Sequence, residues 1–185
     1  YSVADIDKRV RNKSYKILNS KKIIVKKGLL KNKVENFYHP YFFNRKKKLP
    51  FVTGKVAISK NNIIYSKSQK RITNAYSDQF THLLRYQNDC IMITYKTLNK
   101  DNPRLNCRLK GMKNFSPKRI ILDNELNSNM NSYIFKSSNN KNTLIFYNKA
   151  DKSKISKFKK KGIILIKSKI GMDNKFDIKE ILKKL

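Results

Sequence analysis

Short apolar runs alternate with segments of helical spacing along this chain, and this alternation constrains the fold more than any other feature. Four runs have the length and the Ile and Leu content of buried strands; they cover residues 90–94, 119–123, 143–147 and 162–167. A final segment, 177–185, has helical spacing. Strands that alternate with helices in this way predict an α/β domain with a mostly parallel sheet flanked by helices.

The first third of the chain has weaker signals. Residues 30–45 carry apolar side chains at helical spacing, and Pro40 inside them predicts a kink or break. Residues 51–59 alternate in the manner of a strand. A helix is expected over residues 73–86.

The helix over residues 73–86 should begin at a side-chain cap and bury an apolar stripe. Either Thr73 or Asn74 can serve as the cap. The stripe consists of Phe80, Leu83 and Leu84. The strand that follows, 90–94, is almost continuously apolar, which favours burial on both sides.

The charge of the chain is strongly positive. Forty-four Lys and Arg against 12 Asp and Glu give a formal net charge of +32, which alone would favour a polyanionic partner. Only eight of the basic residues are Arg, and the lysine runs 46–48 and 159–161 fall at expected element ends, as on solvated surfaces. A basic nucleic-acid-binding protein of the ribosomal type is therefore kept as the alternative, although no RNA- or DNA-binding motif is found.

The remaining composition favours a cytoplasmic protein. Cys90 and Cys107 are isolated, so neither a disulfide nor a zinc site is indicated, and a reducing compartment fits. No apolar run reaches the roughly 18 residues of a membrane span, and no signal peptide is recognisable. Because the chain opens at Tyr1 without Met, we expect the natural N-terminus to lie upstream.

The segment 97–108 is the richest in chemical groups. It follows an expected strand, and ligands of parallel sheets bind where the strands end. It offers the hydroxyl of Thr97, the carboxylate of Asp101, a turn at Pro103 and the guanidinium groups of Arg104 and Arg108. Forked N–H donors of this kind suit a phosphate group.

This segment fits the pattern T-x-x-x-D-[DN]-P-x-L-x-x-R, and it resembles the reductase domain of the riboflavin-biosynthesis bifunctional deaminase-reductase family. Further blocks match the family in order: Lys55 to Ser59 as K-x-[AG]-x-S, Ile72-Thr73, Leu84-Arg85, and 117–123 as P-x-R-[IV]-[IV]-[IL]-D. The first 30 residues, with Asp5, Asp7 and Arg9, are similar to the end of the family's deaminase domain.

The resemblance implies a dihydrofolate-reductase-like, mostly parallel sheet that is incomplete at the C-terminus. It divides the chain into a deaminase remnant at 1–29, a linker helix at 30–48 and the front of a pyrimidine reductase domain at 49–185. The family's glycine-rich turn for the dinucleotide phosphate is not found before Leu185. We therefore expect this piece to be inactive alone.

The resemblance also assigns site residues. Each of them could instead have a purely structural role, as a turn former or as a cation at a helix end. Substrate contacts fall on Arg85, Leu105, Arg108 and, more weakly, Gln69; cofactor contacts fall on Ala57, Thr97, Asp101, Asn124 and, more weakly, Arg71; Asp101 is the catalytic candidate. Gln69 and Arg71 stand near positions where the family usually has Ser and Trp. The isolated His39 and His82 are expected to have surface or packing roles.

The implied activity is NADPH-dependent reduction of 5-amino-6-(5-phosphoribosylamino)uracil at ribose C1′, giving the ribitylamino product. Zinc would belong only to the deaminase half, because H-x-E and P-C-x-x-C are absent from this chain. The expected partner is a small phosphoribosyl-pyrimidine, with no nucleic acid and no membrane; a homo-oligomer is compatible with the sequence. A degenerate, noncatalytic remnant is the third alternative.

Overall fold

A computed structural model describes residues 1–64, 72–138 and 142–185. The chain divides into two compact units, residues 1–54 with 182–185 and residues 55–181, and each is described by itself. The helices are α1 (Lys13–Ser20), α2 (Lys31–Lys47), α3 (Ala75–Gln87), α4 (Tyr95–Asp101), α5 (Tyr133–Lys136), α6 (Lys152–Lys160) and α7 (Ile178–Lys183).

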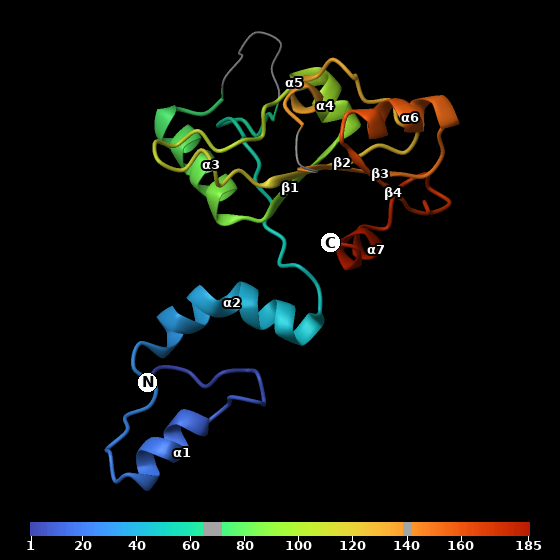
Figure 1. The fold of residues 1–185 in the computed structure, drawn as a ribbon. Coiled ribbons are helices and arrows are strands. Elements are labelled where there is room, and N and C mark those ends of the chain that lie inside the picture. The colour runs from blue at the N-terminus through green and yellow to red at the C-terminus, as the bar shows by residue number, and fades with distance from the viewer. Residues whose placement is uncertain (65–71, 139–141) are drawn as a thin grey trace. The chain divides into compact units, whose positions relative to one another are not determined.

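The larger unit is built on a four-stranded parallel sheet (Figure 1). Its strands are β1 (Cys90–Thr94), β2 (Lys118–Leu122), β3 (Thr143–Tyr147) and β4 (Ile164–Lys167), and they lie side by side in chain order. Thr94 pairs with Leu122, which pairs with Phe146, so the carboxyl ends of the first three strands are aligned. The expectation of an α/β fold with a parallel sheet is confirmed.

One face of the sheet carries the main core. Helices α4, α5 and α6 lie on this face (Figure 1). Ile121 and Ile145, from the two central strands, are fully buried against them. The cluster is Leu98, Leu105, Ile121, Leu126, Ile134, Phe135, Ile145, Phe158 and Ile163. Because apolar side chains come from every layer, the sheet and the three helices form one packed body.

The opposite face has a smaller core. Ile120 and Phe146, which alternate with the residues of the first face, are buried there with Ile181 of α7. Cys90, Met92 and Leu122 are only partly buried beside them. The described residues therefore cover this face less completely than the first.

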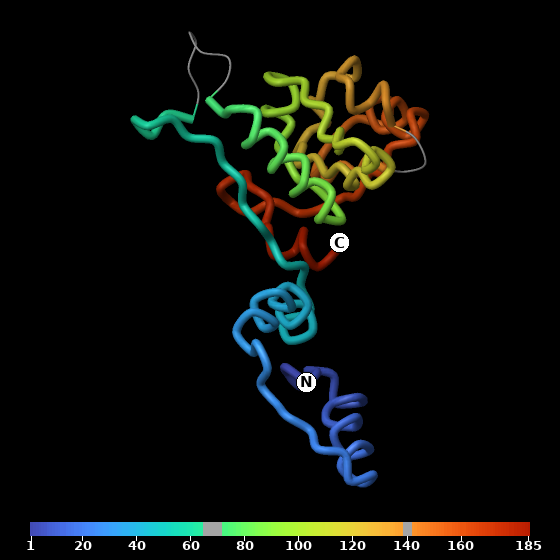
Figure 2. The backbone as a smooth tube through the Cα atoms, turned by 90° about the vertical axis from the view of Figure 1, so that its left-hand side faces the viewer, coloured from blue at the N-terminus to red at the C-terminus, as the bar shows by residue number. Residues whose placement is uncertain are grey.

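Three expectations about local structure were wrong. Residues 51–59 form no strand; they run as an extended segment (Figure 2), with Val56 66% and Ile58 53% exposed. An alternating pattern supplies strand propensity, but a strand also needs a paired neighbour, which this segment lacks among the described residues. Strand β1 is half-buried because it lies at the edge of the sheet, and Phe80 is 59% exposed.

Helix α3 begins as expected at Asn74. Its side-chain oxygen accepts a hydrogen bond from the backbone N–H of Ser77 at 2.9 Å. Thr73, the other candidate cap, instead donates its hydroxyl to Asp78 at 3.1 Å. The cap satisfies one of the free N–H groups of the first turn and fixes where the helix starts.

In the smaller unit, α2 runs through Pro40 without interruption; of the expected kink or break, the break is therefore not found. The ring of Pro40 removes one N–H from the ladder of hydrogen bonds, and the rest of the helix is formed on both sides of it.

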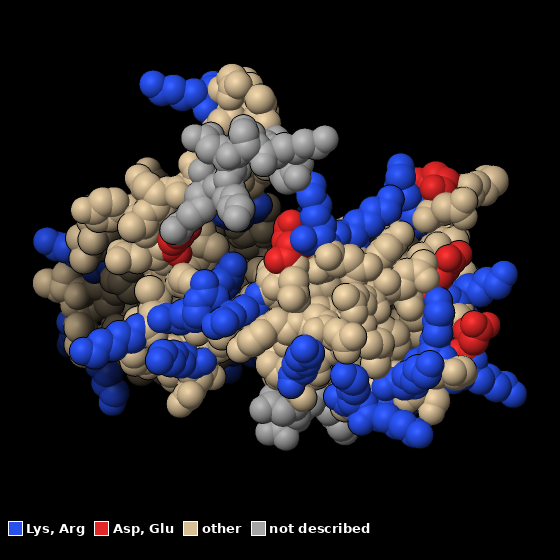
Figure 3. All heavy atoms as spheres, turned by 90° about the horizontal axis from the view of Figure 1, so that it is seen from above, with Lys and Arg blue, Asp and Glu red and all other residues tan. Residues whose placement is uncertain are grey.

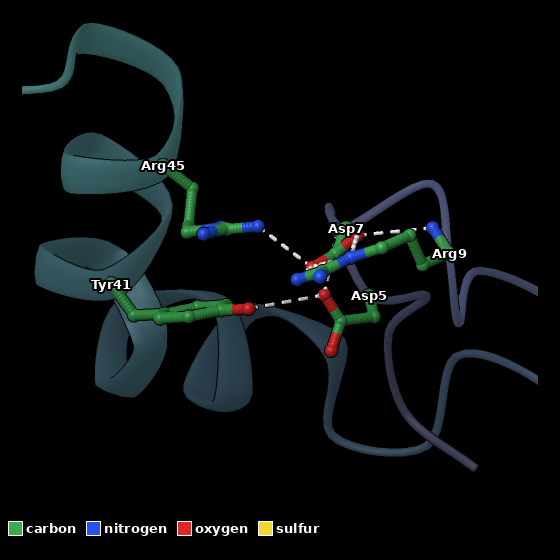
Figure 4. Close-up of polar contacts among 5 residues, drawn as sticks. All are labelled: Asp5, Asp7, Arg9, Tyr41 and Arg45. Carbon is green, nitrogen blue, oxygen red and sulfur yellow. Dashed lines mark hydrogen bonds and ion pairs between the residues drawn. The ribbon is translucent and has the colours of Figure 1, made fainter.

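An acidic pair holds α2 against the N-terminal segment (Figure 4). Asp7 pairs with Arg9 at 2.6 Å and with Arg45 of α2 at 2.7 Å, and the hydroxyl of Tyr41 donates to Asp5 at 3.3 Å. The hydrogen bond from Arg9 is the main reason why the pKa of Asp7 lies far below its usual 3.8. These contacts join the segment that resembles the end of a deaminase domain to the helix that follows it.

Candidate functional site

A cavity of about 350 Å³ opens beside α3 in the larger unit. Its lining residues are Ala57, Ile72, Thr73, Asp78, Thr81, His82, Arg85 and Arg108. Half of them come from α3, where residues three and four apart share one face. Arg108 comes from the segment that follows α4.

Arg85 projects into this cavity from the last turn of α3. It is half-buried, and its Nη1 donates to the backbone oxygen of Asn106 at 3.2 Å. Its Nε is buried and has no hydrogen-bond partner among the described residues. Burial, followed by the nearby charge of Arg108, lowers the pKa of Arg85 below its usual value. This guanidinium thus retains an unused donor in an environment that favours a negatively charged ligand.

Arg108 reaches the same cavity from the other side of Asn106. Its Nη1 donates to the side-chain oxygen of Asn106 at 3.0 Å, and its backbone N–H donates to Nδ1 of His82 at 3.2 Å. Asn106 therefore accepts from both guanidinium groups. The structure brings together Arg85 and Arg108, which lie 23 positions apart in the sequence, around one cavity with Ala57.

Leu105 is placed differently. It is 5% exposed, belongs to the main core and has a φ of +53°. It lines a second cavity of about 160 Å³, beside Arg104 and the buried Arg119. Its side chain is part of the packing, and the turn that it forms directs Asn106 toward α3.

Thr97 and Asn124 follow the carboxyl ends of β1 and β2 closely, whereas Asp101 lies further along, at the end of α4. The segment that follows β1 begins with the short helix α4. Thr97 lies in its first turn, with its N–H bonded to Thr94 Oγ1 at 3.4 Å, and Asp101 is its exposed last residue. Asn124 follows β2, and its Oδ1 is buried without a partner among the described residues. None of the three lines the larger cavity. Gln69 and Arg71 lie outside the described residues.

Asp123 fixes the loop that carries Asn124. Its carboxylate is fully buried and accepts from the N–H groups of Asn127 at 2.8 Å and Ser128 at 2.7 Å, and from the hydroxyl of Ser128 at 2.6 Å. The backbone oxygen of Asn124 in turn accepts the N–H groups of residues 148 and 149. The end of β2 is thus held rigidly in place.

Replacing Asp123 by alanine is expected to lower the free energy of unfolding by about 3 kcal/mol, because two N–H groups and a hydroxyl lose their buried acceptor. Urea unfolding followed by circular dichroism measures the loss. Glu125→Ala, two residues further on at an exposed position, is the control and should stay within about 0.5 kcal/mol of the parent. A loss below about 1 kcal/mol for Asp123→Ala would contradict this account of the loop.

Sequence reasoning missed Asn106 and His82. His82 had been expected to have only a surface or packing role, yet it lines the cavity and bonds to the segment that carries Arg108. Its position three residues before Arg85 on a helix places it on the same face, which is a signal that the sequence contained.

Other kinds of site find less support in the structure. In the described ranges there is no group of three His, Cys, Asp or Glu side chains that could hold a metal ion. Among the same residues, no helix has the length and apolar character needed to cross a membrane. Lys and Arg side chains are scattered over the face seen in Figure 3 instead of forming one patch.

A family model matches most of the chain. Residues 50–185 match the model described as the RibD C-terminal domain. The chain belongs to the RibD C-terminal domain family. The match includes every residue of the larger cavity.

Curated relatives agree with this assignment. The chain is 28% identical over 163 residues to a riboflavin biosynthesis protein RibD of Actinobacillus pleuropneumoniae, covering 87% of this chain and 43% of the relative. It is 38% identical over 78 residues to a 2,5-diamino-6-ribosylamino-4(3H)-pyrimidinone 5′-phosphate reductase of Debaryomyces hansenii, covering 40% of this chain and 32% of the relative. The chain thus spans less than half the length of these relatives.

Solved structures share the fold. Form 1 of Acinetobacter baumannii RibD superposes with a TM-score of 0.76 at 20% identity, covering all of this chain and 49% of the other. A deaminase/reductase of Thermotoga maritima gives a TM-score of 0.74 at 22% identity, covering 98% of this chain and 48% of the other. None of these matches supports the nucleic-acid-binding alternative.

Proposed function

We propose that this chain is part of a pyrimidine reductase of riboflavin biosynthesis, which reduces 5-amino-6-(5-phosphoribosylamino)uracil at ribose C1′ to the ribitylamino product with NADPH. The single observation that carries this proposal is the pairing of Arg85 and Arg108 around one cavity in a RibD C-terminal domain. Paired guanidinium groups with forked N–H donors match the geometry and charge of a sugar phosphate.

The two arginines are proposed to bind the phosphate of the substrate. Each already uses one N–H on Asn106, and Arg85 keeps a buried Nε donor that no described residue occupies. Gln69 and Leu105 are further proposed substrate contacts, and Ala57, which is proposed as a cofactor contact, lines the same cavity. Fixing the phosphate at one end of the substrate orients C1′ for the reaction.

Residues at the carboxyl ends of β1 and β2 are proposed to hold the nicotinamide cofactor. The unpartnered, buried Oδ1 of Asn124 fits a ligand that donates a hydrogen bond there, and Thr97 lies in the first turn of the helix that follows β1. Asp101, the last residue of that helix, is a further proposed contact. Arg71 is a weaker candidate. When bound, the cofactor supplies the hydride that C1′ receives.

Asp101 is proposed to supply the proton. As C1′ gains a hydride, its bond to the ribose ring oxygen breaks and that oxygen must be protonated. Asp101 is exposed at the end of α4, so its carboxyl group is accessible to a substrate. A carboxyl group in this role acts as a general acid.

The test is a reductase assay with the protein in its natural full-length form. Addition of 5-amino-6-(5-phosphoribosylamino)uracil should cause NADPH oxidation and yield the ribitylamino product, identified by mass spectrometry. The substrate without its phosphate should react poorly. Absence of NADPH oxidation by the full-length protein would contradict the proposed function and favour a noncatalytic remnant.

Three further properties belong to this proposal. We place the protein in the cytoplasm, give it a small-molecule partner instead of nucleic acid, and leave room for a homo-oligomer. The zinc of the deaminase reaction is assigned to the part of such proteins that this chain does not contain.

Replacing Asn106 by aspartate is expected to raise the KM for the substrate about tenfold, because the new carboxylate would pair with Arg108 and compete with the phosphate. Asn106→Ala, which keeps the backbone oxygen for Arg85, should have a smaller effect. Steady-state kinetics at several salt concentrations measure the KM of both variants. A KM for Asn106→Asp equal to that of the parent would show that the phosphate does not bind between these arginines.

A further inference from the structure

Residues 106–108 are attached to α3 by three hydrogen bonds. Nη1 of Arg85 donates to the oxygen of Asn106 at 3.2 Å, Sγ of Cys107 donates to the backbone oxygen of His82 at 3.5 Å, and the N–H of Arg108 donates to Nδ1 of His82 at 3.2 Å. Two of the three bonds end on His82. Cys107 is 1% exposed, so the segment is anchored on its other side by packing.

We propose that His82 is a positioning residue of the phosphate site, whose neutral ring holds the backbone at Arg108 so that both guanidinium groups face one cavity. This inference rests on the proposed function, because it refines how that site binds phosphate. His82 also lines the cavity itself.

The hydrogen bond requires a defined form of the ring. Nδ1 accepts from an N–H and therefore carries no proton, so the proton of the neutral ring lies on Nε2. In the cavity, the charged groups beside the ring are Arg85 and Asp78 from α3 and Arg108 from the facing segment. The ring thus keeps a single N–H donor, on Nε2.

The surroundings favour this neutral form. Burial lowers the pKa of His82 below its usual 6.5, followed by the charges of Arg108 and Arg85, while the backbone oxygen of Asn106 acts in the opposite direction. The net shift is downward. At neutral pH the ring therefore adds no third positive charge, and it remains able to accept the N–H of Arg108.

The contact to His82 limits the flexibility of the segment that carries Arg108. Arg108 is exposed and lies in a segment without regular secondary structure, so its backbone needs an external contact to hold one conformation. The contact to His82 supplies it before the ligand arrives, and a preorganised site loses less entropy on binding. Loss of the acceptor should consequently weaken phosphate binding without changing the chemical step.

The experiment compares His82→Leu with His82→Asn in the full-length protein. Leucine removes the acceptor, whereas the side-chain oxygen of asparagine can replace Nδ1. His82→Leu should raise the KM for the substrate and the inhibition constant of inorganic phosphate about tenfold, with kcat changed less than about twofold. His82→Asn should restore most of both values. His39→Leu, which alters the other histidine of the chain, in the smaller unit, is the matched control.

Two outcomes would overturn the proposal. One is an unchanged phosphate affinity in His82→Leu, and the other is an Asn variant as impaired as the Leu variant although circular dichroism shows both to be folded. The ¹⁵N chemical shifts of the parent provide an independent check, since an unprotonated Nδ1 is expected and a protonated Nδ1 would contradict the geometry. If the parent lacks reductase activity, the proposed function fails, while calorimetric titration of parent and variants with inorganic phosphate still decides the role of His82.

Discussion

Exchange of Asp101 for asparagine is expected to lower kcat of the full-length reductase by at least about a hundredfold, which is the usual contribution of a general acid. Asparagine keeps the shape of the side chain but cannot donate an acidic proton. Asp101 is the candidate because the family pattern places it there and its exposed side chain is accessible to a ligand.

The backbone next to Asp101 is fixed, which makes the substitution interpretable. Asn102, with a φ of +42°, closes α4 through its N–H to Leu98, and its Oδ1 accepts the N–H of Tyr133 at 2.8 Å. Single-turnover measurements isolate the chemical step. Asp151→Asn, at another exposed aspartate, is the control. If Asp101→Asn keeps the turnover of the parent, another group or water delivers the proton.

Replacement of Arg85 by alanine is expected to have a second large effect, on the KM for the substrate. We expect the KM for the phosphorylated substrate to rise about a hundredfold, since a half-buried guanidinium bonded to a phosphate contributes roughly 2–3 kcal/mol. The variant also frees the oxygen of Asn106 and so loosens the segment that carries Arg108. Arg85→Lys keeps the charge but not the forked N–H donors, so its KM should lie between those of the parent and of Arg85→Ala.

The phosphate-free substrate distinguishes this account from general damage to the fold. Arg85→Ala should leave the poor reaction of that substrate almost unchanged, because the lost interaction involves only the phosphate. Arg104→Ala is the matched control, since Arg104 lies over the ring of Tyr133 at 4.7 Å and lines the smaller cavity. If kcat/KM fell equally for the phosphorylated and the phosphate-free substrate, Arg85 would be needed for the stability of the fold and not for binding the phosphate.

The parallel sheet could be predicted from the sequence because its strands are short and apolar. Residues 90–94 and 143–147 agree with β1 and β3 at both ends, and the expected range 119–123 is shifted by one residue from β2. The burial of β1 could not be predicted, since its position at the sheet edge depends on strand order. For residues 51–59 the sequence supplied the alternation but contained no information about a pairing partner.

The candidate site was predictable in part. The family pattern pointed to Arg85 and Arg108, and they line one cavity. Their shared contact, Asn106, was not predictable, because it depends on the positive φ of Leu105 and on how the following residues turn toward α3. The role of each site residue stays a prediction until the variants are measured.

The sequential order of the four strands bears on how the chain folds. Each strand after β1 pairs with the one made just before it, so every partner is already present when a new strand leaves the ribosome. Parallel pairing is slow when it must wait for distant segments, and here it need not wait. The sheet can therefore grow in the direction of translation, one strand at a time, onto a template that is already in place.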